Sequence, residues 1–225
     1  MRRRQHRTHP STIDPFTGVF SPKLVKGFRD LLRRPETAEI NFNFGSVQVH
    51  GHSFREISDL FTDRLGGKGI HVVVHPSLLI EENAGAMYIS GNDTIYVKRF
   101  DLLDDAPGRG TAIHECIHAI CDYRSRSTAI RSEEGAAYVA EAWFRQAAPD
   151  DDLVIFNDPL AERIWDVATA VRARWLKSGA TVSLKGSEIN AVRMAVAQMK
   201  HADGTHVYLN GYYDEHNGIA GHKQA

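Results

Sequence analysis

The chain has little cysteine, no long apolar segment and almost no net charge. Only Cys116 and Cys121 are present among 225 residues. Five helical steps would place their Cα atoms about 8–9 Å apart, which is too far for a disulfide. Two unpaired thiols are typical of a reducing compartment, so we expect a cytoplasmic protein.

Neither hydropathy nor charge indicates a membrane or nucleic-acid partner. The longest apolar candidate, 70–80, is interrupted by His71, His75 and Pro76, and it falls short of the roughly 20 residues that a membrane helix needs. The first seven residues are basic, but no apolar core of a secretory signal follows them. With 27 basic and 28 acidic residues, the formal net charge is -1. We therefore expect no nucleic-acid or membrane partner.

The composition is that of a folded chain, and its patterning indicates one domain behind an arm. Apolar residues make up 42% and charged residues 24%, which argues against disorder and coiled coil. Residues 1–20 show no periodicity and are predicted to form a flexible basic arm. Residues 21–225 contain no linker and are predicted to form a single domain.

Short helices and strands are expected in the first part of this domain. Apolar residues recur at helical spacing from 21 to 35 and nearly alternate with polar residues from 38 to 50, which predicts a helix and then two strands. Ser53 followed by Glu56 has the pattern of a capping box. A second helix is therefore expected to begin there and to end at 66–67.

Strands are expected to give way to helices along the chain. A β-branched run at 70–74 predicts an internal strand, and 86–89 and 94–98 flank a turn-rich segment typical of a hairpin. Helices are then predicted over 104–123, 131–146, 159–177 and 186–200. Because strands come first and helices later, the predicted fold class is α+β.

The clearest chemical signal is His114-Glu115-Cys116-Ile117-His118, within the first of these long helices. Positions i and i+4 of a helix share a face, so both imidazoles can reach one metal ion. A Zn²⁺ ion lowers the pKa of its water to about 7, and the neighbouring Glu115 can take the proton. The pattern predicts a zinc site with Glu115 as the general base.

A catalytic zinc ion also needs a third protein ligand and an open fourth position. Glu133 and Glu134 open the next predicted helix, and small residues follow them. The two side chains point about 100° apart, so only one should face the metal. Glu134 is the first choice and Glu133 the reserve. Glu141, one heptad later, is expected to support the site or to be solvated.

Other polar residues near the motif could support the chemistry. Asp122 could orient His118 through its second ring nitrogen, or it could be a solvated carboxylate at the helix end. Cys116 is interpreted as a small buried residue and Tyr138 as packing between helices. A donor for the oxyanion of the reaction is sought downstream. The candidates, none selected by its spacing, are His201, His206, Tyr208, Tyr212, Tyr213 and His216.

The motifs resemble those of zincin-fold metallopeptidases of the gluzincin type, and in particular ImmA/IrrE-like peptidases of phages and stress responses. The resemblance covers about 84–145, with His-Glu-x-x-His-Ala-x-x-Asp followed by Glu-x-Ala-Ala-Tyr. It implies a small mixed sheet whose edge hairpin packs on the zinc helix, with further helices behind. It also implies a zinc-dependent hydrolase of peptide bonds with ligands His114, His118 and Glu134.

The chain departs from the better-known branches of this group in the helix after the histidine motif and in the segment that follows this helix. Ala137 or Tyr138 stands where those branches have Asp or Asn, and the chain after 145 matches no pattern among them. The resemblance therefore implies a peptide or protein substrate but does not identify it.

A non-catalytic zinc-binding scaffold and a regulatory module of the same fold are alternative functions. Four filled protein ligands would favour the scaffold, whereas three ligands with an open position would favour a hydrolase. The presence of Glu115 favours the hydrolase, because a structural site has no use for a base beside the metal.

Overall fold

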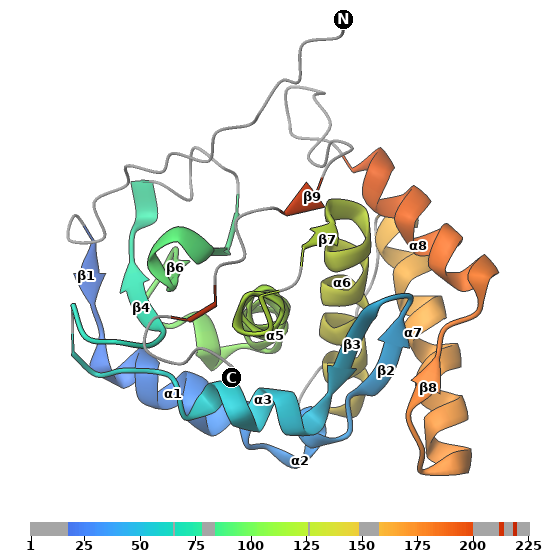
Figure 1. Cartoon of the computed structure of the whole chain (residues 1–225), viewed down its shortest axis with the longest axis horizontal. Coiled ribbons are helices and arrows are strands. Elements are labelled where there is room, and N and C mark those ends of the chain that lie inside the picture. Colours follow the sequence, from blue (N-terminus) through green and yellow to red (C-terminus); the bar gives the residue numbers. More distant parts are fainter. Residues whose placement is uncertain are drawn as a thin grey trace, which may run out of the picture.

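Helices and strands are arranged along the chain as expected for an α+β protein (Figure 1). The computed structural model describes residues 18–64, 66–77, 84–125, 127–148, 158–199, 212–213 and 218–219. No helix in these ranges is long and apolar enough to cross a membrane.

Strands and short helices dominate the first part of the structure. In chain order they are β1 (Val19–Phe20), α1 (Pro22–Leu32), α2 (Pro35–Ala38), β2 (Asn41–Phe44), β3 (Val47–His50), α3 (Gly51–Ser58), β4 (His71–Val74), β5 (Ala86–Ile89) and β6 (Thr94–Val97). The second part is mainly helical. It comprises α5 (Ala106–Tyr123), β7 (Thr128–Ala129), α6 (Ile130–Ala147), α7 (Pro159–Ser178), β8 (Val182–Ser183), α8 (Gly186–Gln198) and β9 (Tyr212–Tyr213).

The main sheet is mixed, with strand order β1-β4-β6-β5. β4 and β6 are parallel and lie inside the sheet, which agrees with their continuous burial, whereas β5 pairs antiparallel with β6 and forms one edge. This is the expected edge hairpin. Two smaller sheets, β3-β2-β8 and β7-β9, lie outside it.

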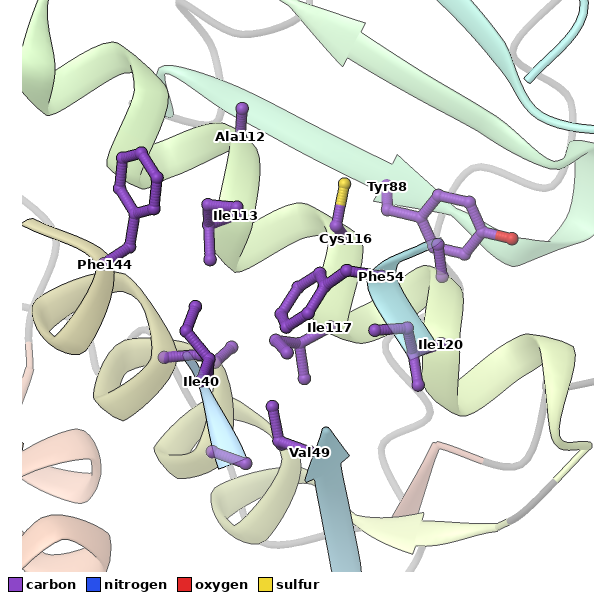
Figure 2. Close-up of a cluster of buried hydrophobic side chains, with 14 of the residues drawn as sticks. Ile40, Val49, Phe54, Tyr88, Ala112, Ile113, Cys116, Ile117, Ile120 and Phe144 are labelled. Atoms are coloured by element: carbon purple, nitrogen blue, oxygen red, sulfur yellow. The ribbon is translucent and has the colours of Figure 1, made fainter. Parts of the chain in front are cut away.

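Helix α5 lies at the centre of the molecule, between the main sheet and α6 (Figure 1). Its apolar side chains enter one hydrophobic core, in which Ile113, Ile117 and Ile120 are almost fully buried. Figure 2 shows them clustered with residues from α3 and the β2–β3 region, including Val49 and Phe54. The helix that carries the His-Glu-x-x-His pattern is therefore held on several sides.

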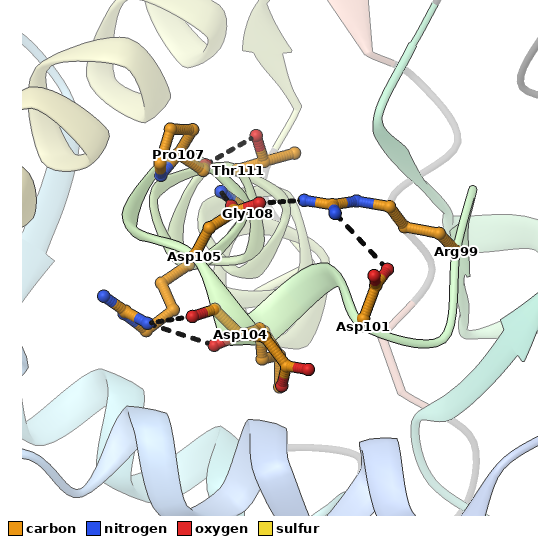
Figure 3. Close-up of polar contacts among 9 residues, drawn as sticks. Arg99, Asp101, Asp104, Asp105, Pro107, Gly108 and Thr111 are labelled. Carbon is orange, nitrogen blue, oxygen red and sulfur yellow. Dashed lines mark hydrogen bonds and ion pairs between the residues drawn. The ribbon is translucent and has the colours of Figure 1, made fainter.

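The start of α5 is fixed by polar contacts (Figure 3). Asp105 is the N-cap and accepts a hydrogen bond from the Gly108 backbone N–H at 2.7 Å. Arg99 pairs with both Asp105 and Asp101, and its hydrogen bond to Asp105 is the main reason that the pKa of this carboxyl is lowered. Arg109 is buried and donates to the carbonyl oxygens of Leu103 and Asp104 in the preceding turn.

Removal of this cap should destabilise the protein without changing the metal ligands. We expect Asp105→Ala to lower the free energy of unfolding by about 1 kcal/mol, because the first turn of α5 loses its side-chain acceptor. Asp105→Ser, which keeps an acceptor, should lose less. Urea unfolding of the two variants measures the difference, and equal losses would contradict the capping role.

The four long helices agree with the sequence-based boundaries to within a few residues, but three expectations in the first part are wrong. The second helix, expected to end at 66–67, is α3, which ends at Ser58 with Asp59 as its C-cap. Residues 19–20, expected in the arm, form β1 and pair with β4; residues 1–17 lie outside the described part. Ser53 does not cap a helix. Helix α3 already begins at Gly51, and Ser53 lies buried inside it, where its hydroxyl accepts from Arg124 Nη2.

Candidate metal centre

Three potential metal ligands converge from two packed helices. His114 and His118 belong to α5, and Glu134 belongs to α6; all three are buried. His114 Nε2 lies 3.4 Å from Glu134 Oε2, and His118 Nε2 lies 3.7 Å from Glu134 Oε1. One ligand atom of each residue lies within 4.8 Å of the other two.

These separations match the size of a small tetrahedral site. Ligand atoms bound to Zn²⁺ at about 2.0–2.1 Å lie about 3.4 Å from one another in a tetrahedron. Two imidazoles and one carboxylate are also a donor set that zinc accepts. In the described part of the chain this is the one group of three or more such side chains that could hold a metal ion. The residues therefore fit a divalent cation.

Glycine allows the two ligand-bearing helices to approach closely. A Cβ atom at Gly110, one turn before His114, would lie 2.8 Å from Arg145 Cδ of α6. Of the small residues after Glu134, Gly135 makes room for β2 and not for α5, because a Cβ atom at Gly135 would lie 2.7 Å from Phe44 Cζ of β2. The approach of the helices thus depends on α5 as well as on the small residues of α6.

Two further carboxylates lie beside the other ring nitrogens of the histidines, one in a hydrogen bond and one at ion-pair distance. His118 Nδ1 lies 2.8 Å from Glu133 Oε1, and the second oxygen of Glu133 accepts from the Thr128 hydroxyl. His114 Nδ1 lies 3.4 Å from Glu141 Oε2. Both Nε2 atoms are thereby directed toward Glu134. This arrangement places Glu134 among the ligand atoms, and it places Glu133 and Glu141 behind the imidazoles, where such partners orient metal-binding histidines.

The expectation that Asp122 could orient His118 is wrong. Asp122 is fully buried and accepts from the Tyr88 hydroxyl at 2.7 Å and from the Gly218 backbone N–H at 3.0 Å. The helical spacing from His118 to Asp122 is correct, but the Nδ1 atom of His118 faces α6. Glu133, in the first turn of that helix, is the nearer acceptor.

Negative charge surrounds the two histidines. Burial lowers the pKa of His114, but the nearby carboxylates of Glu134 and Glu141 outweigh this effect and raise the pKa well above its ordinary value. Burial also lowers the pKa of His118, but the charge of Glu134 and the hydrogen bond and charge of Glu133 outweigh burial and raise this pKa above its ordinary value. The carboxylates therefore favour positive charge at this point. One divalent cation carries the same charge as the two protons that it would replace.

Glu115 lies beside the ligands and contacts the edge of the main sheet. Its side chain is buried, and Oε2 accepts a hydrogen bond from the Tyr88 backbone N–H at 2.7 Å. The carboxylate thus lies between α5 and β5, and its charge contributes to the raised pKa values of both His114 and His118. Its position suits a group that exchanges protons with a molecule bound in the cluster of ligand atoms.

The remaining residues predicted near the site fall into three groups. Cys116 is fully buried, and burial raises the pKa of its thiol, as expected for a small core residue. Tyr138 contacts the site more closely than expected, because its ring lies edge-on to His114 with centroids 4.4 Å apart. The candidate oxyanion donors lie outside the described residues, except that the backbone of 212–213 is described as β9.

The two neighbouring glutamates should differ in their effect on metal binding. Glu133→Ala removes an orienting partner of His118, so we expect it to weaken zinc binding by about 10- to 100-fold. Glu134→Ala removes a ligand, so we expect it to weaken zinc binding by more than this. Competition against a chromophoric chelator measures both affinities. A larger loss in Glu133→Ala would exchange the two roles.

Comparisons of the chain with protein-family models, with curated proteins and with solved structures find no match.

Proposed function

We propose that this protein is a zinc-dependent metallopeptidase with a zincin-type fold of the gluzincin kind. The observation that carries the proposal is the convergence of His114 Nε2, His118 Nε2 and the Glu134 carboxylate, with buried Glu115 beside them. Three protein ligands leave a position open for a water molecule or a substrate, as in catalytic zinc sites.

The neighbouring edge strand supports a peptide as the substrate. Lys98 N–H donates to Gly85 O, so residues 85 and 98 form a hydrogen-bonded pair of the β5–β6 hairpin. Because such pairs alternate in antiparallel strands, the backbone groups of Ala86 and Tyr88 point away from β6. The Tyr88 N–H accordingly reaches Glu115. An extended peptide could add to this edge through the remaining outward groups, beside the metal ligands.

The chemistry divides between the cation and the side chains of this chain. His114, His118 and Glu134 would hold Zn²⁺, which, when bound, acidifies a water molecule and polarises the carbonyl of the scissile bond. Tyr88 N–H holds Oε2 of Glu115, and Oε1 takes the proton of the attacking water. Glu115 then donates this proton to the leaving amine. Glu133 and Glu141 keep the imidazoles oriented throughout.

A non-catalytic zinc scaffold is the competing function, and the two differ in the fourth ligand. Among the described residues the fourth nearby carboxylate, Glu141, approaches Nδ1 of His114 and is not part of the ligand cluster. This favours the hydrolase. Metal analysis of purified protein, combined with cleavage of a peptide library by wild type and by Glu115→Gln, tests the proposal. Full zinc occupancy without any cleavage by the wild type would favour the scaffold.

A further inference from the structure

Tyr88 connects the candidate base to a second buried carboxylate of the same helix. Its backbone N–H donates to Glu115 Oε2 at 2.7 Å, and its hydroxyl donates to Asp122 Oδ2, also at 2.7 Å. Glu115 and Asp122 are about two helical turns apart on α5. One residue of β5 therefore bridges two points of the helix that carries the histidines.

Residues near the C-terminal end contact this bridge. Gly218 N–H donates to Asp122 Oδ1 at 3.0 Å, and the next side chain, Ile219, is fully buried in the hydrophobic core. Gly218 has φ 81°, and a Cβ atom there would lie 2.9 Å from Ser125 Oγ. Only glycine adopts this backbone conformation without strain, so the docking geometry depends on it.

We propose that the docking of Gly218 and Ile219 on Asp122 positions Glu115 through Tyr88. This inference rests on the proposed function, because it gives Glu115 the role of base, and it makes Asp122 and Tyr88 positioning residues. Gly218 holds one oxygen of Asp122, and the other oxygen holds the Tyr88 hydroxyl. The backbone N–H of the same tyrosine is thereby aimed at Glu115.

The place of β5 in the sheet makes this anchoring necessary. Among the described strands, β5 lies at the edge of the sheet and pairs with β6 on one side, so its position depends on the contacts of its other side. Those contacts include the two bonds of Tyr88 to α5 and a longer bond from its hydroxyl to Asp93 Oδ1 at 3.4 Å. When the docked residues leave Asp122, the edge strand and Glu115 shift together, while the imidazoles stay in place on Glu133 and Glu141.

Hydrogen exchange at the backbone amide of residue 88, followed by NMR on the full chain, tests this inference. Tyr88→Phe removes the hydroxyl, and Gly218→Ala disturbs docking while leaving Tyr88 and Asp122 intact. Each should speed exchange at residue 88 about tenfold, the size expected for losing one buried hydrogen bond. Zinc affinity should be unchanged. For any library peptide that is cleaved, kcat/KM should fall about tenfold, because the base and the edge strand to which the peptide adds are displaced together.

Tyr96→Phe is the matched control, because Tyr96 lies on β6 of the same hairpin and its hydroxyl accepts from Asn92. Exchange at residue 88 should be unchanged in this variant. Equal acceleration in Tyr96→Phe would show general loosening of the hairpin and overturn the proposal. Wild-type exchange in Gly218→Ala, with its fold intact by circular dichroism, would overturn the role of the docked residues. The exchange measurement needs neither zinc nor cleavage, so failure of the proposed function would be seen separately, in the metal analysis and in Glu115→Gln.

Discussion

Replacing either histidine of the site by alanine should reduce bound zinc from one ion per chain to almost none. Each substitution removes one of three ligand atoms that lie within 4.8 Å of one another, and the two remaining ligands do not define a closed site. Loss of an orienting partner alone costs about 10- to 100-fold in affinity, so loss of a ligand should cost more. Metal analysis after dialysis against a weak chelator measures the occupancy of His114→Ala and His118→Ala.

His71 provides a matched control for this experiment. It is also buried, on β4, and its Nε2 lies 3.1 Å from the Gly67 carbonyl oxygen, outside the ligand cluster. His71→Ala should retain full zinc occupancy. Full occupancy in both His114→Ala and His118→Ala would refute the assignment of the site.

Glu115→Gln should leave zinc bound and the fold intact but should slow peptide hydrolysis by about 10²- to 10⁴-fold, the range that general base catalysis contributes. Glutamine has nearly the same size, and its amide oxygen can still accept from the Tyr88 N–H, so the contact with β5 can persist. The basic oxygen is lost. Zinc content, thermal unfolding and cleavage of a library peptide measure the three expectations.

Glu56→Gln, which changes an exposed glutamate of α3, serves as the control and should alter none of the three. Loss of zinc or unfolding in Glu115→Gln would make Glu115 a structural residue. Hydrolysis at the wild-type rate would place the base at another residue.

The four long helices could be predicted because their boundaries are encoded locally, whereas the short helix α3 both begins and ends earlier than its sequence pattern indicates. Pro159 follows the N-cap Asp158, and Gly179 ends the same helix in the left-handed region that glycine favours, so α7 agrees with the sequence pattern. The two-residue strand β1 carries no such signal. It forms because Val19 and Phe20 meet β4, more than 50 residues away in sequence.

The part of the candidate site that could be predicted is the part that helical spacing determines. The i, i+4 rule brings His114 and His118 together, and the small residues beside Glu134 indicate a close neighbour. The rule does not give the rotation of an imidazole ring, so the partner of His118 Nδ1 could not be chosen between Asp122 and the next helix. The contact between Tyr88 and Glu115 joins a strand to a helix, and no sequence pattern predicts this contact.

The most direct test of the metal site is a crystal structure of the zinc-loaded protein with anomalous scattering measured at the zinc edge. We expect one strong anomalous peak per chain, within about 2.0–2.2 Å of His114 Nε2, His118 Nε2 and a Glu134 carboxylate oxygen, with solvent in the fourth position. A peak at other residues, or a fourth protein ligand that closes the site, would contradict this expectation.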